Sequence, residues 1–173
     1  IAKIAKLDGV PVFNRPLELA KDKTSTELVL LNTLDQYEND GNDLPEWIMT
    51  LPPTSPLRSA SSLTTFIEKL DSVSKDIDCI MSVTENRGDF WSFEPDGNFQ
   101  RLFPNAPRRQ QDRTPLFEEN SSIYLTRVTA LKETGSILGR NVIGIPISNY
   151  ESLDINTSDD LKLAEVLIKY YRM

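Results

Sequence analysis

Residues 51–58, with the sequence LPPTSPLR, limit the folds open to this chain more than any other segment does. They follow the short apolar run at residues 47–51 and precede Leu63, Phe66 and Leu70, which recur at helical spacing. A strand, a loop and a helix in this order are typical of α/β folds, which hold ligands at the carboxyl ends of strands. The paired prolines remove backbone donors and stiffen the loop. The segment is therefore either a ligand-binding loop or an ordinary rigid turn.

Length and charge restrict the class of protein. The 173 residues fit a single domain, residues 1–173, with a proper hydrophobic core. A formal net charge of −7 argues against a nucleic-acid or anionic-membrane binder, although Arg101, Arg108, Arg109 and Arg113 form a local basic group. The sequence shows no signal-peptide pattern and no apolar run long enough to span a bilayer, so it predicts a cytoplasmic protein.

The chain has no histidine and a single cysteine. These counts exclude Ser-His-Asp catalysis and any zinc site built on histidine or on several cysteines. Cys79 lies in the apolar run at residues 77–83, which predicts a small buried hydrophobic side chain in a reducing compartment. The chemistry of this protein must therefore come from carboxylates, amides, hydroxyls and arginines.

Helical and strand-like segments alternate along the chain, which predicts an α/β fold. Thr24 and Glu27 have the spacing of a capping box at the start of a helix, and Thr157 and Asp160 have the spacing of an N-terminal cap. Strands are expected at residues 47–51, 76–84, 122–126 and 142–147, and helices at residues 24–37, 63–70, 128–134 and 157–171.

A predicted hairpin interrupts this alternation. Its strands, residues 90–93 and 99–103, are rich in aromatic side chains and flank a turn at residues 95–98. Residues 104–119 then form a polar, cationic stretch without periodicity, and long irregular loops in compact domains tend to be functional or mobile. This loop is a second candidate site.

Four blocks of residues, in order over almost the whole chain, resemble the acylneuraminate cytidylyltransferases, the CMP-sialic acid synthetase group. The blocks are RPLELAKDKTS at residues 15–25, PTSPLR at 53–58, RRQ, TPLFEEN and IY within 108–124, and LDINTSDDL at 153–161. The resemblance implies a Rossmann-like, three-layer α/β/α nucleotidyltransferase fold with a mixed sheet. It also implies Mg²⁺-dependent transfer of CMP from CTP to a sialic-acid-like nonulosonic acid, with release of pyrophosphate.

The resemblance also implies roles for individual residues. Asp154 and Arg109 would be catalytic: Asp154, with Asn156, would hold Mg²⁺ against the nucleotide phosphates, and Arg109 would face the acid sugar and the phosphates. The nucleotide would contact Arg15, Thr24, Ser25, Thr26, Thr54 and Ser55, and the sugar would contact Pro52, Arg58, Arg109, Asn120 and Tyr124.

Structural alternatives stay open at several of these positions. Arg15 could be a surface salt-bridge residue, Thr24 only a helix cap, and Arg109 part of a solvated charge run. Tyr124 could equally belong to the core. Asp154 could simply end a strand ahead of the last helix.

The chain departs from the family pattern at three positions. Pro52 stands where many members carry a glutamine, Asn156 replaces a second acidic residue, and Ser121 replaces a glycine. The family's Gly-rich phosphate loop has no counterpart ahead of Ile1, so the first βαβ unit is expected to be missing and the chain to begin near the end of the second helix. The side-chain changes concern the identity of the sugar more than the type of reaction.

The hairpin and the loop after it, about residues 87–118, resemble the dimerisation arm of the family. Phe90, Trp91, Phe93, Phe99 and Phe103 are more aromatic side chains than a small exposed hairpin keeps uncovered, so we expect a homodimer. Two other functions remain open: a different sugar nucleotidyltransferase, and a non-catalytic domain that binds a partner through residues 90–117.

Overall fold

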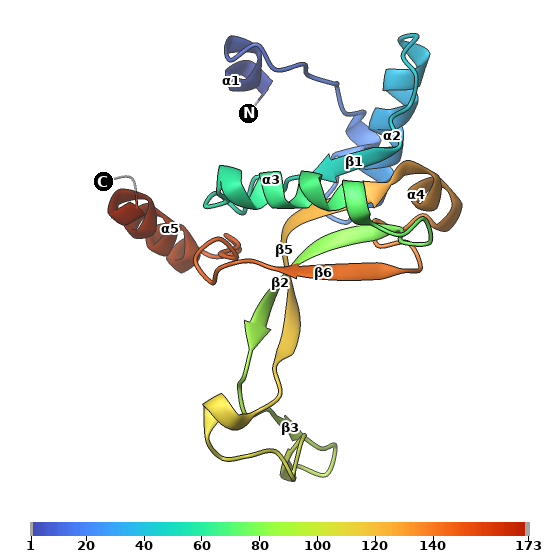
Figure 1. Cartoon of the computed structure of the whole chain (residues 1–173). Coiled ribbons are helices and arrows are strands. Elements are labelled where there is room, and N and C mark those ends of the chain that lie inside the picture. The colour runs from blue at the N-terminus through green and yellow to red at the C-terminus, as the bar shows by residue number, and fades with distance from the viewer. Residues whose placement is uncertain (1, 172–173) are drawn as a thin grey trace. The chain divides into compact units, whose positions relative to one another are not determined.

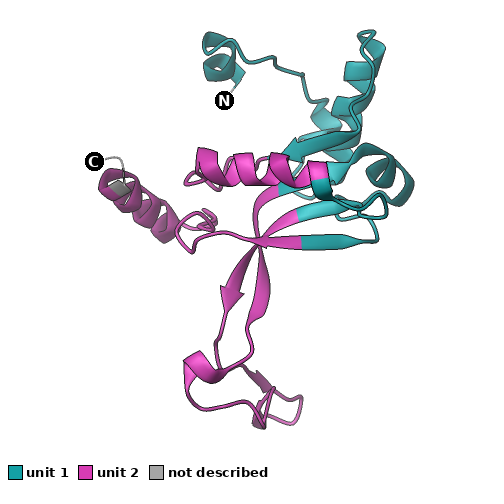
Figure 2. Ribbon diagram, in the orientation of Figure 1, with its two compact units in different colours: residues 1–50, 72–80, 124–143 teal, residues 51–71, 81–123, 144–173 magenta. Residues whose placement is uncertain are grey.

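The computed structural model describes residues 2–171, and Figure 1 shows its helices and strands. The chain divides into two compact units (Figure 2). Unit 1 consists of residues 1–50, 72–80 and 124–143, and unit 2 consists of residues 51–71, 81–123 and 144–173.

Four strands form the main sheet, in the order β1-β5-β2-β6. Strand β1 is antiparallel to β5, with Trp47 opposite Arg127 and Thr50 opposite Tyr124. Cys79 at the start of β2 is fully buried, as its apolar surroundings predict. The predicted strands are all present, although β1 is only half-buried rather than buried. Their bounds are Trp47–Thr50 for β1, Cys79–Asn86 for β2, Leu116–Arg127 for β5 and Val142–Pro146 for β6.

Unit 1 has an apolar cluster between two helices. Leu34 of α2 (Thr26–Asn39) packs with Val128 and Leu131 of α4 (Val128–Thr134). Gly135 ends α4 with a φ of 66°, a left-handed conformation that favours glycine, as the sequence predicts. The remaining helices of this unit are α1 (Ala2–Leu7) and the 3-10 turn Leu17–Leu19.

The expected capping box at the start of α2 is wrong by one residue. Ser25, not Thr24, is the N-cap, because Ser25 has the extended backbone that precedes the first helical residue. Its hydroxyl accepts a hydrogen bond from the N–H of Leu28 at 3.4 Å.

Unit 2 contains α3 (Ala60–Lys69) and α5 (Ser158–Tyr171), and the 3-10 turn Leu70–Ser72 follows α3. Thr157 and Asp160 bond reciprocally at the start of α5, which confirms the predicted cap. Of the helices described here, none combines the length and the hydrophobicity that a membrane span requires.

The predicted hairpin is present in unit 2. Strands β3 (Trp91–Phe93) and β4 (Phe99–Arg101) pair antiparallel, and Figure 1 shows them at the tip of the extension formed by β2 and β5. Strand β5 begins at Leu116, earlier than expected, so the irregular loop is shorter than the sequence suggests. It also contains the 3-10 turn Gln110–Asp112. We call residues 87–118 the arm.

Candidate functional site

A polar pocket of about 270 Å³ lies in unit 2, between the middle of β5 and the segment before α5. It brings together three residues that the sequence predicts for one site, Asn120, Asp154 and Asn156. We call residues 152–156 the Asp154 turn and residues 51–58 the proline loop. The lining residues are Thr84, Glu118, Glu119, Asn120, Ser121, Ser152, Asp154 and Asn156.

Asp154 has one carboxylate oxygen that is satisfied and one that is not. Its Oδ2 accepts a hydrogen bond from Nδ2 of Asn156 at 2.9 Å, whereas Oδ1 is buried and has no hydrogen-bond partner within residues 2–171. A buried, unpaired carboxylate oxygen is costly unless a cation or a donor binds it. The donor set therefore fits Mg²⁺, which prefers hard oxygen ligands.

These residues alone do not form a complete metal cage. No group of three or more acidic, histidine or cysteine side chains in the described chain could hold a metal ion. Mg²⁺ is commonly bound by one or two carboxylates together with substrate phosphates. Asp154 and Asn156 thus suit a metal that arrives with a nucleotide.

Asn120 is held rigidly on β5. Its Oδ1 accepts from the Ser82 hydroxyl at 2.6 Å, and its Nδ2 donates to the Thr84 hydroxyl at 2.8 Å. The next residue, Ser121, has a φ of 55°, in the left-handed region that favours glycine. This strained position is the one at which the similar family carries a glycine.

The proline loop is attached to the Asp154 turn and to β5. The carbonyl of Thr54 accepts from the N–H of Ile155 at 2.9 Å, which places the loop beside the turn. Arg58 donates to the carbonyls of Pro52 at 2.8 Å and Ser122 at 3.2 Å, and burial lowers the pKa of its guanidinium. Arg58 therefore links the proline loop to β5 through backbone carbonyls. Ser55 is fully buried, and its hydroxyl has no hydrogen-bond partner within the described residues.

Glu151 is a further residue beside the pocket that the sequence did not predict, and it is 5% exposed. Its carboxylate accepts hydrogen bonds from the Ser59 N–H at 2.8 Å and from the hydroxyls of Ser62 at 2.8 Å and Ser148 at 2.7 Å. Burial raises the pKa of Glu151, but these hydrogen bonds outweigh burial and hold its pKa at about 2. No local spacing rule joins an acid to serines some 90 residues away, so the sequence offered no signal for it.

Arg109 and Tyr124 do not line the polar pocket of about 270 Å³ that contains Asp154, which we call the Asp154 pocket. The Arg109 side chain lies on the arm, is 74% exposed and forms an ion pair with Asp112 at 3.8 Å. Tyr124 is buried in β5, in keeping with the core alternative. Contact of either residue with a sugar stays a prediction.

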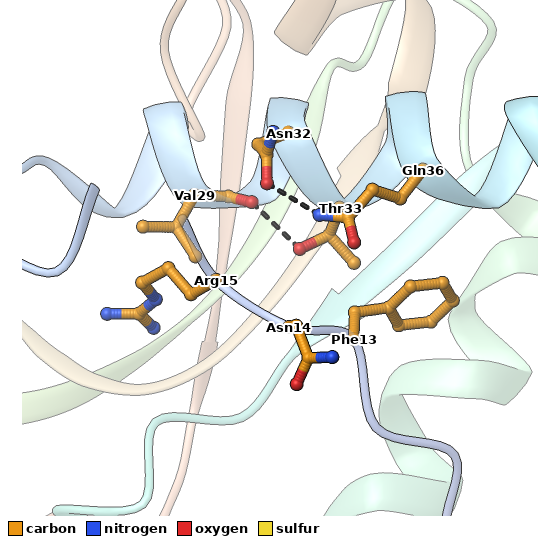
Figure 3. A pocket seen from close by; sticks show the side chains of 7 residues that line it. All are labelled: Phe13, Asn14, Arg15, Val29, Asn32, Thr33 and Gln36. Atoms are coloured by element: carbon orange, nitrogen blue, oxygen red, sulfur yellow. Dashed lines mark hydrogen bonds between the residues drawn. The ribbon is translucent and has the colours of Figure 1, made fainter. Parts of the chain in front are cut away.

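Unit 1 has a separate, smaller pocket of about 100 Å³ along α2 (Figure 3). Arg15 lines this pocket together with the polar residues Asn32, Thr33 and Gln36, and it is exposed to solvent. In Figure 3 its guanidinium lies on the Val29 side, away from Gln36. In the described part of the chain Arg15 has no ion pair, so the salt-bridge alternative gains no support. Ser25 and its neighbours Thr24 and Thr26 stand at the start of the same helix. Nucleotide contact here stays a prediction.

No protein-family model matches the chain. The chain is 25% identical over 172 residues to post-translational flagellin modification protein B of Campylobacter coli, covering 98% of this chain and 73% of that protein. It also resembles the crystal structure of 4-diphosphocytidyl-2C-methyl-D-erythritol synthase from Anaerococcus prevotii, with a TM-score of 0.56 and 12% identity over 85% of this chain and 68% of the other. The structural likeness confirms the predicted Rossmann-like α/β fold.

Proposed function

We propose that this protein is a cytidylyltransferase that transfers CMP from CTP to a sialic-acid-like nonulosonic acid and releases pyrophosphate. One observation carries the proposal: Asp154, whose buried Oδ1 has no hydrogen-bond partner within the described residues, lines a polar pocket together with Asn120 and Asn156. Two likenesses support it, one to a synthase named for a diphosphocytidyl compound and one to a flagellin modification protein.

In this proposal Asp154 and Asn156 would hold Mg²⁺, and the bound metal would neutralise charge on the CTP phosphates. The anomeric hydroxyl of the sugar attacks the α-phosphorus and loses its proton to water, while the bond from that phosphorus to the bridging oxygen breaks and pyrophosphate leaves. The protein forms no covalent bond to the substrate, so its contribution is to position the reactants. The rigid amide of Asn120 would shape the sugar side of the pocket.

Pyrophosphate release by the intact protein tests this function. With CTP, Mg²⁺ and a panel of nonulosonic acids, we expect release that Asp154→Ala reduces at least about 100-fold, as when a group that stabilises a transition state is removed. Asp159→Ala is the matched control, because Asp159 is an exposed acid nearby that forms an ion pair with Lys162 at 2.8 Å. Release only from another nucleotide and a sugar phosphate would favour the other nucleotidyltransferase class. Absence of both release and calorimetric CTP binding would favour a non-catalytic binding domain.

We further propose that the arm mediates a homodimer. Its tip exposes an aromatic group in which Trp91 and Phe93 lie 5.1 Å and 4.7 Å from Phe99, between ring centroids. Such a group on a small hairpin suits a protein interface. We expect Phe93→Ser to weaken a dimer in sedimentation experiments, and Val166→Ser, on the exposed face of α5, to leave it unchanged. A wild-type protein that is monomeric at micromolar concentration contradicts this part of the proposal.

A further inference from the structure

We infer that Glu151 is a positioning residue of this site, whose buried carboxylate fixes the Asp154 turn against the proline loop. The inference rests on the proposed function only in assigning Asp154 to the metal and the phosphates. The coupling of the two segments by Glu151 is a separate claim, and it can be tested in the protein without any ligand.

The contacts of Glu151 join segments that are far apart in the sequence. One carboxylate oxygen, Oε1, binds the backbone N–H of Ser59 and the hydroxyl of Ser62, both at the start of α3. The other, Oε2, binds the hydroxyl of Ser148, shortly after β6. The backbone carbonyl of Glu151 accepts from the hydroxyl of Ser122 on β5 at 3.3 Å. A single residue therefore connects the start of α3, the chain after β6 and the middle of β5.

The proline loop and the Asp154 turn each adjoin, in the sequence, a residue of this group of contacts. The proline loop ends at Arg58, next to Ser59, and the Asp154 turn begins one residue after Glu151. The two segments meet again where the Ile155 N–H donates to the Thr54 carbonyl. This closed loop of contacts fixes the place of Asp154, because a shift at either end must break a hydrogen bond of Glu151 or the one between Ile155 and Thr54.

The charge of Glu151 has a second effect at the N-terminus of α3. A helix start presents unpaired N–H groups and a partial positive charge, which favour an anion. Here the Ser59 hydroxyl accepts from the Ser62 N–H, and Glu151 takes the Ser59 N–H and supplies the negative charge. The protein's own carboxylate thus occupies a position that a phosphate could otherwise take. We expect substrate phosphates to bind elsewhere, without competition from this helix.

Hydrogen exchange in the unliganded, intact protein tests the coupling. For Glu151→Ala we expect exchange at least about 10-fold faster both in residues 51–59 and in residues 152–156, with no change along α2. The conservative Glu151→Gln should also speed up exchange in both segments, but by a smaller factor, because the glutamine carbonyl can still accept a hydrogen bond from the Ser59 N–H. Glu68→Ala and Glu68→Gln are matched controls, since Glu68 is an exposed acid on α3. Faster exchange confined to the first turn of α3 would overturn the inference and leave Glu151 as a helix cap. Should Glu151→Ala fail to fold, Glu151→Gln alone decides between these outcomes.

Kinetics of the same variants separate this inference from the proposed function. If the wild-type protein releases pyrophosphate, we expect Glu151→Gln to require at least about fivefold more Mg²⁺ for half-maximal rate, while Glu68→Gln behaves as wild type. An unchanged Mg²⁺ requirement, despite coupled exchange, would overturn the role of Glu151 in the site. If the wild-type protein neither binds CTP nor releases pyrophosphate, the proposed function fails, and the exchange experiment still decides whether Glu151 joins the two segments.

Discussion

Two regions of unit 2 are each organised around one carboxylate, but with donors of different kinds. Beside the Asp154 pocket, Glu151 is almost fully buried, and its partners are neutral hydroxyls and a backbone N–H. On the arm, the Asp89 side chain is 20% exposed, and its partners are guanidinium groups. Arg101 binds it through Nε at 2.6 Å and Nη2 at 3.0 Å, and Arg113 binds it at 3.3 Å.

This difference shows which region is built for fixed geometry. Neutral donors around a buried acid bind only in particular directions, and dissolved salt does not screen them. Ion pairs near the surface tolerate more variation in geometry and weaken as ionic strength rises. The pocket side should therefore stay rigid as the salt concentration rises, whereas the arm should become more mobile.

The largest contrast should appear when one aromatic side chain is removed from each region. Phe66 on α3 is 0% exposed, whereas Phe93 at the tip of the arm is 77% exposed. We expect Phe66→Ala to lower the free energy of unfolding by about 3 to 5 kcal/mol, through lost burial and a cavity. At protein concentrations low enough for the chain to be monomeric, Phe93→Ala should change it by less than about 0.5 kcal/mol. Urea denaturation measures both, and equal losses would mean that the arm has a buried core of its own.

Lowering the pH should remove the contribution of the buried Glu151 carboxylate to the free energy of unfolding. The pKa of Glu151 is about 2 in the folded protein, below its usual 4.5, so the unfolded chain takes up the proton first as pH falls. Its contribution to stability is complete above pH 4.5 and is lost between pH 4.5 and 2, on the order of 3 kcal/mol in total. Urea denaturation at several pH values should show a smaller acid loss for Glu151→Gln than for the wild type. The same loss in both would mean that other acids dominate.

Salt should act on the arm. The hydrogen bond from Arg101 and the nearby guanidinium charges lower the pKa of Asp89. Burial raises this pKa, but its effect is smaller than theirs. In 1 M NaCl, where charges are screened beyond about 3 Å, we expect several-fold faster hydrogen exchange in residues 87–113 and no change in residues 51–59. Asp89→Asn should show fast exchange at low salt, and Asp112→Asn, at an exposed position, should not. Salt sensitivity that is stronger in the proline loop would reverse the comparison.

The smallest effect concerns Ser121, on the pocket side. Its left-handed backbone should make Ser121→Gly more stable than Ser121→Ala by about 1 kcal/mol. Both variants lose the hydroxyl, so their difference isolates the backbone preference. At Ser61, inside α3, the order should invert, because alanine favours the helix. Thermal denaturation of the four variants checks the sign, and a more stable Ser121→Ala would mean that the backbone relaxes out of this conformation.

Local signals in the sequence predicted most of the fold. Helix α4 was predicted at its observed bounds, because Gly135 supplies an unambiguous stop. The start of α2 was missed by one residue, since Thr24 and Ser25 are both good caps and only the backbone decides between them. The start of β5 was missed because Leu116 and Phe117 are exposed, so the strand carries no burial pattern there.

The candidate site was harder to predict than the fold. Motif order led to Asp154, Asn156 and Asn120, which the structure brings into one pocket. It gave no sign of Glu151, whose partners at Ser59 and Ser62 lie about 90 residues away. Motif order also could not show that Arg58 binds the backbone carbonyls of Pro52 and Ser122. An arginine at this place in a motif looks the same in the sequence whether it contacts a ligand or the protein itself.

The pairing of β1 with β5 has a consequence for synthesis of the chain. Trp47 meets Arg127, about 80 residues later, so this pairing cannot form until β5 has been made. At about 5 to 20 residues per second, a ribosome needs about 4 to 16 s to reach that strand. During that interval the residues of β1 lack their partner in β5. Slower translation would lengthen this period, and with it the demand for chaperones.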